Sequence, residues 1–389
     1  MTIISDGRVD ATAGDPGPDA TPHIETFDPR SGVSLGRVPD RNAIEVGEAV
    51  VRARVAFDAW GGLAFDERRE HILSVRDLLL DRLGRIVAVI TSETGKLDAE
   101  AVFTEIMTAC ETIQYYAKHG ERALRPQKVS AGLMSHKRAE RSYEPLGVVG
   151  VISPWNYPFI LAMTTIITAL FAGNADVLKP SEVTPLVGVA IGGLFADVGG
   201  HPDLVQVVTG GGATGEALVR SGVQKICFTG SVRTGKRVMA AASDTLTPVL
   251  LELGGKDPMI VCADADLDRA PPARCGARFR TRANTVVHPN RFTESPRSTA
   301  IARRTTSARC HRLGDRAFGV DIHRLQPVFI TLGRWIARLG LVRWRCCHLG
   351  DASTGEITVK CLAVLPTLIL AIVPFVSAVS IHPALGTIR

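Results

Sequence analysis

The sequence predicts an α/β fold in which helices flank a parallel β-sheet. Between Gly147 and Gly254, short apolar runs rich in β-branched residues alternate with segments long enough to form a helix. Crossovers of this length between strands indicate a parallel sheet with helices on both faces. The expected strands are Val148 to Ile152, Asp176 to Lys179, Leu204 to Val208, Lys225 to Thr229 and Val249 to Leu253.

Three helical patterns precede the predicted sheet. The first follows Asp40, and its apolar residues recur at alternating steps of four and three, as on one buried helix face: Val46, Val50, Ala53, Phe57 and Trp60. The second runs from about Asp66 and stops near Gly95, because glycine suits a helix end. The third carries Phe103, Ile106, Cys110, Ile113 and Ala117. Residues 129–145 are polar and alternating up to Tyr143, and they predict an extended hairpin.

Length and composition bound the class of protein. A chain of 389 residues predicts more than one compact unit. The eight cysteines lack CxxC spacing, so we expect a reduced, cytoplasmic compartment and no metal site. Residues 1–22 are polar and lack a basic region followed by an apolar core, which predicts a disordered leader and no secretory signal.

The loops after the predicted strands carry the candidate binding residues, because such sheets bind ligands at the carboxyl ends of their strands. Gly210 to Gly212 would let a ligand approach the backbone, and Gly230-Ser231 would open a helix whose amides attract phosphate. Glycines at a turn between a strand and a helix more often reflect ordinary turn chemistry. Lys179 and Glu182 suit the hydroxyls or phosphate of a ribose, or they form a charged pair on a surface loop.

Two residues are candidates for catalysis. Glu252 ends an apolar strand, and partial desolvation there would raise its pKa toward the range of a general base. Asn156 lies between Trp155 and Tyr157 and offers an amide donor for an oxyanion. A solvated strand-end glutamate and a structural loop asparagine are the alternatives.

Taken together, these segments resemble the aldehyde dehydrogenase superfamily from roughly Glu25 to Ala270. The order and spacing of six motifs carry the resemblance. The motifs are Glu93-Thr-Gly-Lys96, Pro145-Leu-Gly-Val-Val-Gly-Val-Ile-Ser-Pro-Trp-Asn-Tyr-Pro-Phe159, Ala172-Gly-Asn-Ala175, Lys179-Pro-Ser-Glu182, Phe228-Thr-Gly-Ser231 and Leu251-Glu-Leu-Gly-Gly-Lys256.

The resemblance implies a cofactor-binding domain over 23–270 with a variant Rossmann fold, which accounts for the missing GxGxxG fingerprint. It implies that Asn156 stabilises the oxyanion and that Glu252 activates water to hydrolyse a thioester. The positions that match cofactor contacts are Trp155, Lys179, Ser181, Glu182, Gly230, Ser231 and Leu253. The reaction implied is oxidation of an aldehyde to a carboxylic acid, in which a cysteine attacks the aldehyde and hydride passes to NAD, with NADP as the alternative cofactor. Hairpin 129–145 would serve the family's homo-oligomer, although we find no C-terminal strand for its oligomerisation sheet.

The resemblance ends after Asp266-Leu-Asp-Arg-Ala270. The family continues into a segment of the type FxNxGQxC, but this chain continues Pro271-Pro-Ala-Arg-Cys-Gly-Ala-Arg-Phe-Arg280. The nucleophilic cysteine is expected near Val286, where there is none, and Cys275 and Cys310 lack the surrounding motif. We therefore predict an irregular tail over 271–389 and an impaired aldehyde dehydrogenase, or alternatively a non-catalytic nucleotide-binding remnant.

The tail itself admits two interpretations. It is rich in arginine and contains no lysine between Lys256 and Lys360, as a change of coding frame would produce. A genuine basic module would instead neutralise nucleic-acid phosphates, but the tail contains no nucleic-acid motif, so we expect no such partner. The apolar run 362–381 is long enough for a transmembrane helix, yet Pro366 and Pro374 interrupt it, and an accidental apolar run explains it equally well.

Overall fold

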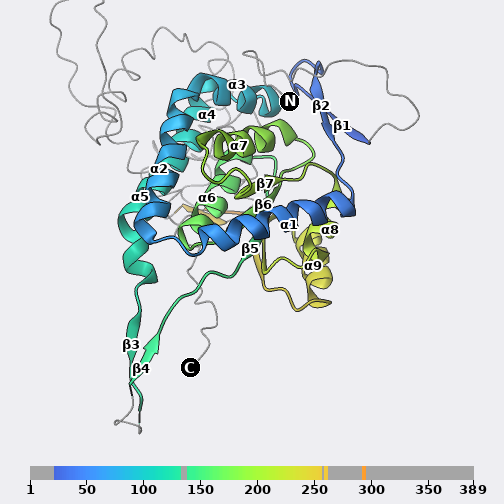
Figure 1. Ribbon diagram of the computed structural model, residues 1–389. Coiled ribbons are helices and arrows are strands. Elements are labelled where there is room, and N and C mark those ends of the chain that lie inside the picture. The colour runs from blue at the N-terminus through green and yellow to red at the C-terminus, as the bar shows by residue number, and fades with distance from the viewer. Residues whose placement is uncertain (1–21, 133–137, 256–257, 262–290, 295–389) are drawn as a thin grey trace, which may run out of the picture. The chain divides into compact units, whose positions relative to one another are not determined.

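The computed structural model of the protein describes residues 22–132, 138–255, 258–261 and 291–294. Residues 1–21 of the predicted leader and most of the arginine-rich tail, with its apolar run 362–381, lie outside the described residues. Contacts divide the chain into two units, one of residues 1–124 with 144–320 and the other of 125–143 with 321–389. The first unit contains the sheet (Figure 1).

A five-stranded parallel sheet forms the centre of the first unit and confirms the predicted fold class (Figure 1). Its strands are β5 (Val148–Ile152), β6 (Ala175–Lys179), β7 (Val205–Val207), β8 (Lys225–Gly230) and β9 (Val249–Leu253). The strand order is β7-β6-β5-β8-β9, so the chain builds outward from β5 in one direction and then crosses to β8 on its other side. The loops after β5 and β8 therefore flank a topological switch point, where open α/β sheets bind ligands.

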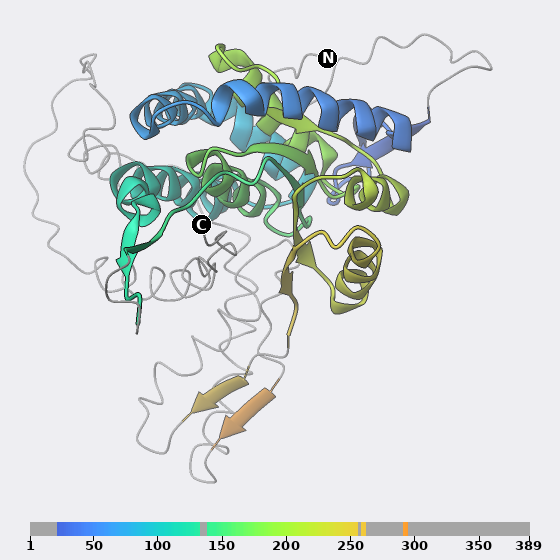
Figure 2. The same ribbon diagram turned by 60° about the horizontal axis from the view of Figure 1, so that its bottom comes forward.

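Four helices connect these strands, and helices lie on both sides of the sheet in Figure 2. They are α6 (Pro158–Phe171), α7 (Pro185–Val198), α8 (Gly212–Arg220) and α9 (Val232–Ser243). Strands β5 and β6 are buried along their whole length, as expected of a parallel sheet covered on both faces.

The helices before the sheet follow the predicted periodicity with one correction. They are α1 (Ala43–Trp60), α2 (Phe65–Asp81), α3 (Leu83–Thr94), α4 (Asp98–Ala101), a π-helical turn η1 (Val102–Ile106) and α5 (Met107–Leu124). The single helix expected from Asp66 to Gly95 is two helices, because Arg82 leaves the helical region with φ −99° and ψ 15°. The predicted stop at Gly95 is confirmed, since Gly95 adopts the left-handed conformation with φ 71°.

Three strand pairs complete the described elements. Strands β1 (His23–Phe27) and β2 (Ser34–Pro39) form an antiparallel hairpin. In the second unit, β3 (Gln127–Val129) and β4 (Ala139–Arg141) form the predicted hairpin, which starts two residues before the expected 129. Strands β10 (Pro258–Val261) and β11 (Arg291–Glu294) pair in parallel, and Figure 2 shows them as one brownish and one orange arrow. Among the described helices, none is both long and apolar enough to cross a membrane.

Candidate functional site

The register of the sheet brings the predicted site residues to one edge. Lys179 of β6 is level with Ile152 of β5, and Ile152 is level with Phe228 of β8, which is level with Leu251 of β9. All the candidate residues lie on this row or within four residues after it: Trp155, Asn156, Lys179, Ser181, Glu182, Gly230, Ser231, Glu252 and Leu253. Four separate sequence segments thus meet at the carboxyl edge of one parallel sheet.

The loop after β5 carries Trp155 and Asn156, both half-buried, and runs directly into α6. Helix α6 begins with Pro158, and its residue before the helix, Tyr157, provides no side-chain cap. Glu105 supplies the missing cap from another part of the chain. Its Oε2 accepts hydrogen bonds from the backbone amides of Phe159 (2.8 Å) and Ile160 (3.3 Å).

Lys96 neutralises the buried Glu105 carboxylate. Its ammonium donates a short hydrogen bond to Glu105 Oε1, and both side chains are fully or almost fully buried. The same ammonium lies 4.0 Å from the centre of the Tyr157 ring, in a cation–π contact. The buried charge pair therefore contacts the loop that contains Asn156 as well as the helix that follows it.

The loop after β6 also contains an ion pair, but only its cation is buried. Lys179 is buried and forms an ion pair of 3.1 Å with Glu182, whose side chain is 55% exposed. Burial would raise the pKa of Glu182, but a hydrogen bond to its own backbone amide and the Lys179 charge outweigh burial, so this pKa is lowered. The site therefore presents an anionic carboxylate to solvent beside a buried cation.

Helix α7, which follows this loop, also begins with a proline, Pro185, and also lacks a side-chain cap. Glu93 provides it, accepting hydrogen bonds from the amides of Leu186 (2.9 Å) and Val187 (2.8 Å). A third bond, 3.1 Å long, comes from the Thr26 hydroxyl of β1. Burial raises the pKa of Glu93 to about 8, although these three hydrogen bonds oppose the shift.

The β8 side of the edge is more open. Ser231 caps its own helix, because its hydroxyl accepts a hydrogen bond of 3.2 Å from the Thr234 amide at the start of α9. Ser231 and Val232 are exposed, so the helix N-terminus faces solvent. A side chain at Gly230 would force the Phe228 ring to move, since a Cβ would lie 2.6 Å from it.

Glu252 and Leu253 lie at the end of β9, the outer strand on this side. Burial raises the pKa of Glu252, which is half-buried, in the direction that a general base requires. Leu253 is 39% exposed. The sequence prediction of a partly desolvated glutamate at this strand end agrees with the structure.

The glycines at 210–212 have a structural role. A Cβ on Gly210 would lie 1.9 Å from Thr214 Oγ1, and the Gly211 amide donates to Asp40 Oδ1 at 3.3 Å. The Thr209 hydroxyl donates to the Pro39 carbonyl at 2.6 Å. Of the two explanations offered by the sequence, the turn between β7 and α8 is therefore the one that the contacts support.

Sequence reasoning missed the buried carboxylates. Glu93 and Lys96 were noted only as parts of a family motif, and Glu105 was not singled out. A signal was present: the third helical pattern has apolar residues 103 and 106, and Glu105 lies between them on a segment that becomes largely buried. Asp176 was also overlooked, although it is fully buried and neither carboxylate oxygen has a hydrogen-bond partner in the described part of the chain.

The described thiols are poorly suited to nucleophilic attack. Cys110 lies on α5 and Cys227 within β8, and burial raises the pKa of each to about 12. A catalytic cysteine acts as its thiolate, which such a pKa suppresses at neutral pH. The other six cysteines lie outside the described residues.

The description of the matching family model is aldehyde dehydrogenase family, and the match covers residues 17–297. The chain belongs to this family. The match extends beyond the 23–270 expected from sequence, and β10 pairs with β11 across Ala270, within the matched range. As an aldehyde dehydrogenase family member, the chain has the variant Rossmann sheet that its motifs implied.

Individual relatives support this assignment over part of their length. A 4,4'-diapolycopene aldehyde oxidase from a Methylomonas species is 39% identical over 271 residues, which are 69% of this chain and 51% of the relative. The chain therefore spans about half the length of this curated relative.

Solved structures match the same part. An aldehyde dehydrogenase from Mycobacterium tuberculosis, solved with NAD+, has a TM-score of 0.70 and 30% identity over 75% of this chain and 60% of its own. An Escherichia coli enzyme described as NADP dependent has a TM-score of 0.69 and 32% identity over 74% of this chain and 60% of its own.

Proposed function

We propose that the carboxyl edge of the sheet binds a nicotinamide dinucleotide, with NAD preferred to NADP. The observation that carries the proposal is the shared register row, which gathers all the predicted cofactor residues at the carboxyl edge of the sheet, on both sides of its switch point. The Ser153 hydroxyl, at the start of the β5 loop, is buried and has no hydrogen-bond partner among the described residues, so the site retains an unused polar group.

The donor set fits such a cofactor. The Lys179 ammonium and Glu182 carboxylate would hydrogen-bond a ribose diol, and the exposed N-terminus of α9 at Ser231 would hold a phosphate. The remaining contacts with the cofactor would come from Trp155, Ser181 and Leu253. The anionic Glu182 would repel a 2′-phosphate, which favours NAD.

Titration calorimetry on the full chain with NAD+ and then with NADP+ tests this assignment. We expect NAD+ to bind more tightly, and Glu182→Gln to narrow the difference by weakening repulsion of the 2′-phosphate. Tighter binding of NADP+ by the unmodified chain would overturn the preference. If neither NAD+ nor NADP+ binds, the proposal of a cofactor site at this edge is wrong.

We further propose that the chain derives from an enzyme that oxidises aldehydes but has little of that activity itself. NAD would accept the hydride in such a reaction. Asn156 would donate a hydrogen bond to the oxyanion, and Glu252 would take a proton from water that attacks a thioester. Both roles depend on a cysteine that forms the thioester, and the segment around Val286 supplies none. The second candidate function is therefore a nucleotide-binding remnant.

Aldehyde-dependent formation of NADH or NADPH by the purified chain, with a panel of short aldehydes, separates the two. We expect turnover near background, because loss of one member of a catalytic unit costs several orders of magnitude in rate. Cys275→Ala and Cys310→Ala are the informative variants. Robust turnover abolished by either substitution would show that a displaced cysteine is the nucleophile.

The other expectations about partners and location remain proposals. Hairpin β3–β4 would serve a homo-oligomer, as its resemblance implied, and light scattering of the purified chain tests this. We propose a cytoplasmic protein that binds small molecules and no nucleic acid. Its apolar run 362–381 would not anchor it, and fractionation of cell membranes checks that expectation.

A further inference from the structure

Helices α6 and α7 have the same defect at their N-termini. Each begins with a proline, which has no amide hydrogen, and in each the residue before the helix provides no side-chain cap. Those residues, Tyr157 and Thr184, have nearly the same backbone conformation, φ −133° with ψ 67° and φ −133° with ψ 54°. The first amides that need an acceptor are therefore those of the second and third helical residues.

Two buried glutamates supply the missing caps, and both are tied to the segment 93–96. Glu93 accepts from both of these amides in α7, and Glu105 accepts from both in α6. Glu105 is held by Lys96, which lies three residues after Glu93 in the motif Glu93-Thr-Gly-Lys96. The motif thus caps α7 directly through Glu93, and it supports the cap of α6 through the ion pair between Lys96 and Glu105.

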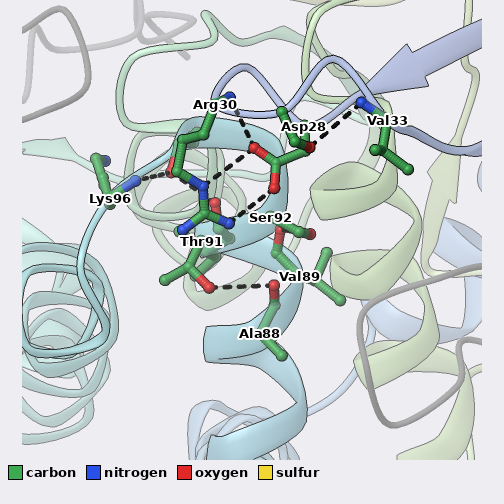
Figure 3. Close-up of polar contacts among 11 residues, drawn as sticks. Asp28, Arg30, Val33, Ala88, Val89, Thr91, Ser92 and Lys96 are labelled. Atoms are coloured by element: carbon green, nitrogen blue, oxygen red, sulfur yellow. Dashed lines mark hydrogen bonds and ion pairs between the residues drawn. The ribbon is translucent and has the colours of Figure 1, made fainter.

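The motif itself is fixed by the hairpin β1–β2. Thr26 donates to Glu93, and a Cβ on Gly95 would lie 3.4 Å from both Pro29 and Arg30. Figure 3 shows Arg30 with its partner Asp28, beside Lys96 and the last turns of α3. Because Gly95 has a positive φ, the chain turns sharply between Glu93 and Lys96, and the two side chains can serve different helices.

We propose that Glu93, Lys96 and Glu105 are positioning residues for cofactor binding. Helices α6 and α7 begin directly after the loops that carry Trp155 and Asn156, and Ser181 and Glu182. Anchoring the first turn of each helix fixes the end of the loop before it, so the loop is ordered before the cofactor arrives. The inference rests on the proposed binding of NAD at this edge.

The test compares full-length variants by amide hydrogen exchange without cofactor. Glu105→Gln keeps one acceptor but removes the charge that two amides share, so we expect about tenfold faster exchange in peptides covering 153–161, with 180–188 unchanged. Glu93→Gln replaces one of the two accepting carboxyl oxygens with an NH2 group, which cannot accept a hydrogen bond, so it should accelerate exchange at 180–188 and leave 153–161 unchanged. Global destabilisation alone would accelerate both peptides together, and that result in both variants would overturn the proposal.

Two further variants keep the test decisive. Leu79→Ala is the matched control, because Leu79 is fully buried on α2 near Arg82, which pairs with Asp197 at the far end of α7. It should lower stability without the reciprocal exchange pattern. Should Glu105→Gln fold poorly because Lys96 is left unpaired, Lys96→Met combined with Glu105→Gln removes both charges. That double variant should fold and still exchange faster at 153–161.

Titration with NAD+ then connects exchange to binding. We expect each motif variant to bind NAD+ about three- to tenfold more weakly than Leu79→Ala, because a loop that is no longer ordered in advance must be ordered when the cofactor binds. Equal affinities would overturn the role in cofactor binding. If the unmodified chain binds no NAD+, the proposed function fails, while the exchange patterns still decide whether the motif orders the two loops.

Discussion

The two halves of the site edge are built differently. On the β5 and β6 side, the loops lead into helices whose first amides are held by the buried Glu105 and Glu93. On the β8 and β9 side, Ser231 caps its own helix, and Ser231 and Leu253 are exposed. The first side takes its geometry from distant segments of the chain, whereas the second takes it from neighbouring residues.

This difference indicates where substitutions should matter. A buried side chain that serves several partners cannot be changed without loss at each of them, because water cannot replace it. An exposed side chain is freer to rotate, and solvent takes the place of lost contacts. We therefore expect large effects on the first side and small ones on the second, and four substitutions test that contrast.

Lys96→Met should have the largest effect. It leaves the Glu105 carboxylate buried without its cation, and removing one partner of a buried pair costs about 3–5 kcal/mol. The free energy of unfolding from urea denaturation measures the loss. Arg220→Met, which removes a partner from exposed ion pairs with Glu216 and Asp244, is the control and should lower the free energy of unfolding far less, because solvent screens exposed pairs. Similar losses in the two variants would contradict the contrast.

Asp176→Val should stabilise the protein, because this carboxyl of β6 is fully buried with no hydrogen-bond partner in the described residues. Replacing such a group with an apolar residue should gain about 1–3 kcal/mol at pH 7. Valine also suits a buried strand.

The gain should depend on pH. Burial raises the pKa of Asp176 well above its ordinary 3.8, so the folded state retains a proton that the unfolded state has lost. Unfolding then releases a proton, and stability falls as pH rises above about 3.8, by up to roughly 1.4 kcal/mol per unit. The advantage of Asp176→Val should therefore grow as the pH rises above about 3.8 toward the raised pKa of Asp176. Asp176→Asn is the control, which removes the titration but leaves a buried polar group. A gain independent of pH would show that Asp176 does not titrate as inferred.

The sequence predicted those elements that depend on local patterns, and it did not predict features that depend on distant contacts. Strands β5 and β9 were predicted residue for residue, because β-branched runs between helical segments are a local signal. The break at Arg82 was not, since apolar periodicity continues across it and only the backbone angles and a distant pairing with Asp197 mark the turn.

The same division applies to the site. Glu252 lies at the end of one predicted strand and Asn156 follows another, so the prediction of a parallel sheet was enough to place both at its carboxyl edge. The role of Glu105 could not, because its hydrogen bonds reach 54 and 55 residues along the chain to α6. Contacts of that kind depend on how helices pack, which periodicity alone does not specify.

Gly188→Ala tests the packing of α7 on the first side. A Cβ at this position would lie 2.4 Å from Cγ and 2.5 Å from Cβ of Pro180, a rigid ring that is itself buried. We expect a loss of about 1–3 kcal/mol from overpacking, measured by urea denaturation. Gly193→Ala on the same helix is the control: nothing lies within 4 Å of its Cβ, so better helix propensity should stabilise by about 0.5–1 kcal/mol. A neutral Gly188→Ala would mean that the Pro180 loop yields easily.

Gly235→Ala, on the second side, should have the smallest effect on stability. A Cβ there would lie 2.6 Å from Leu253 Cδ2, a contact nearly as short as those at Gly188, but the obstacle is the end of a flexible, partly exposed side chain. Rotation of Leu253 should relieve the contact, and the better helix propensity of alanine should offset the remaining strain, so we expect a net change within about 0.5 kcal/mol.

The same substitution should still alter cofactor binding, since it turns Leu253 away from its present position at the sheet edge. We expect NAD+ to bind a few-fold more weakly in calorimetry while urea denaturation shows almost no change. Leu253→Ala provides the comparison, because it removes the same side chain without altering α9. A loss of stability above about 2 kcal/mol in Gly235→Ala would mean that Leu253 cannot rotate. The second side would then be as tightly packed as the first, and the contrast between the two halves would not hold.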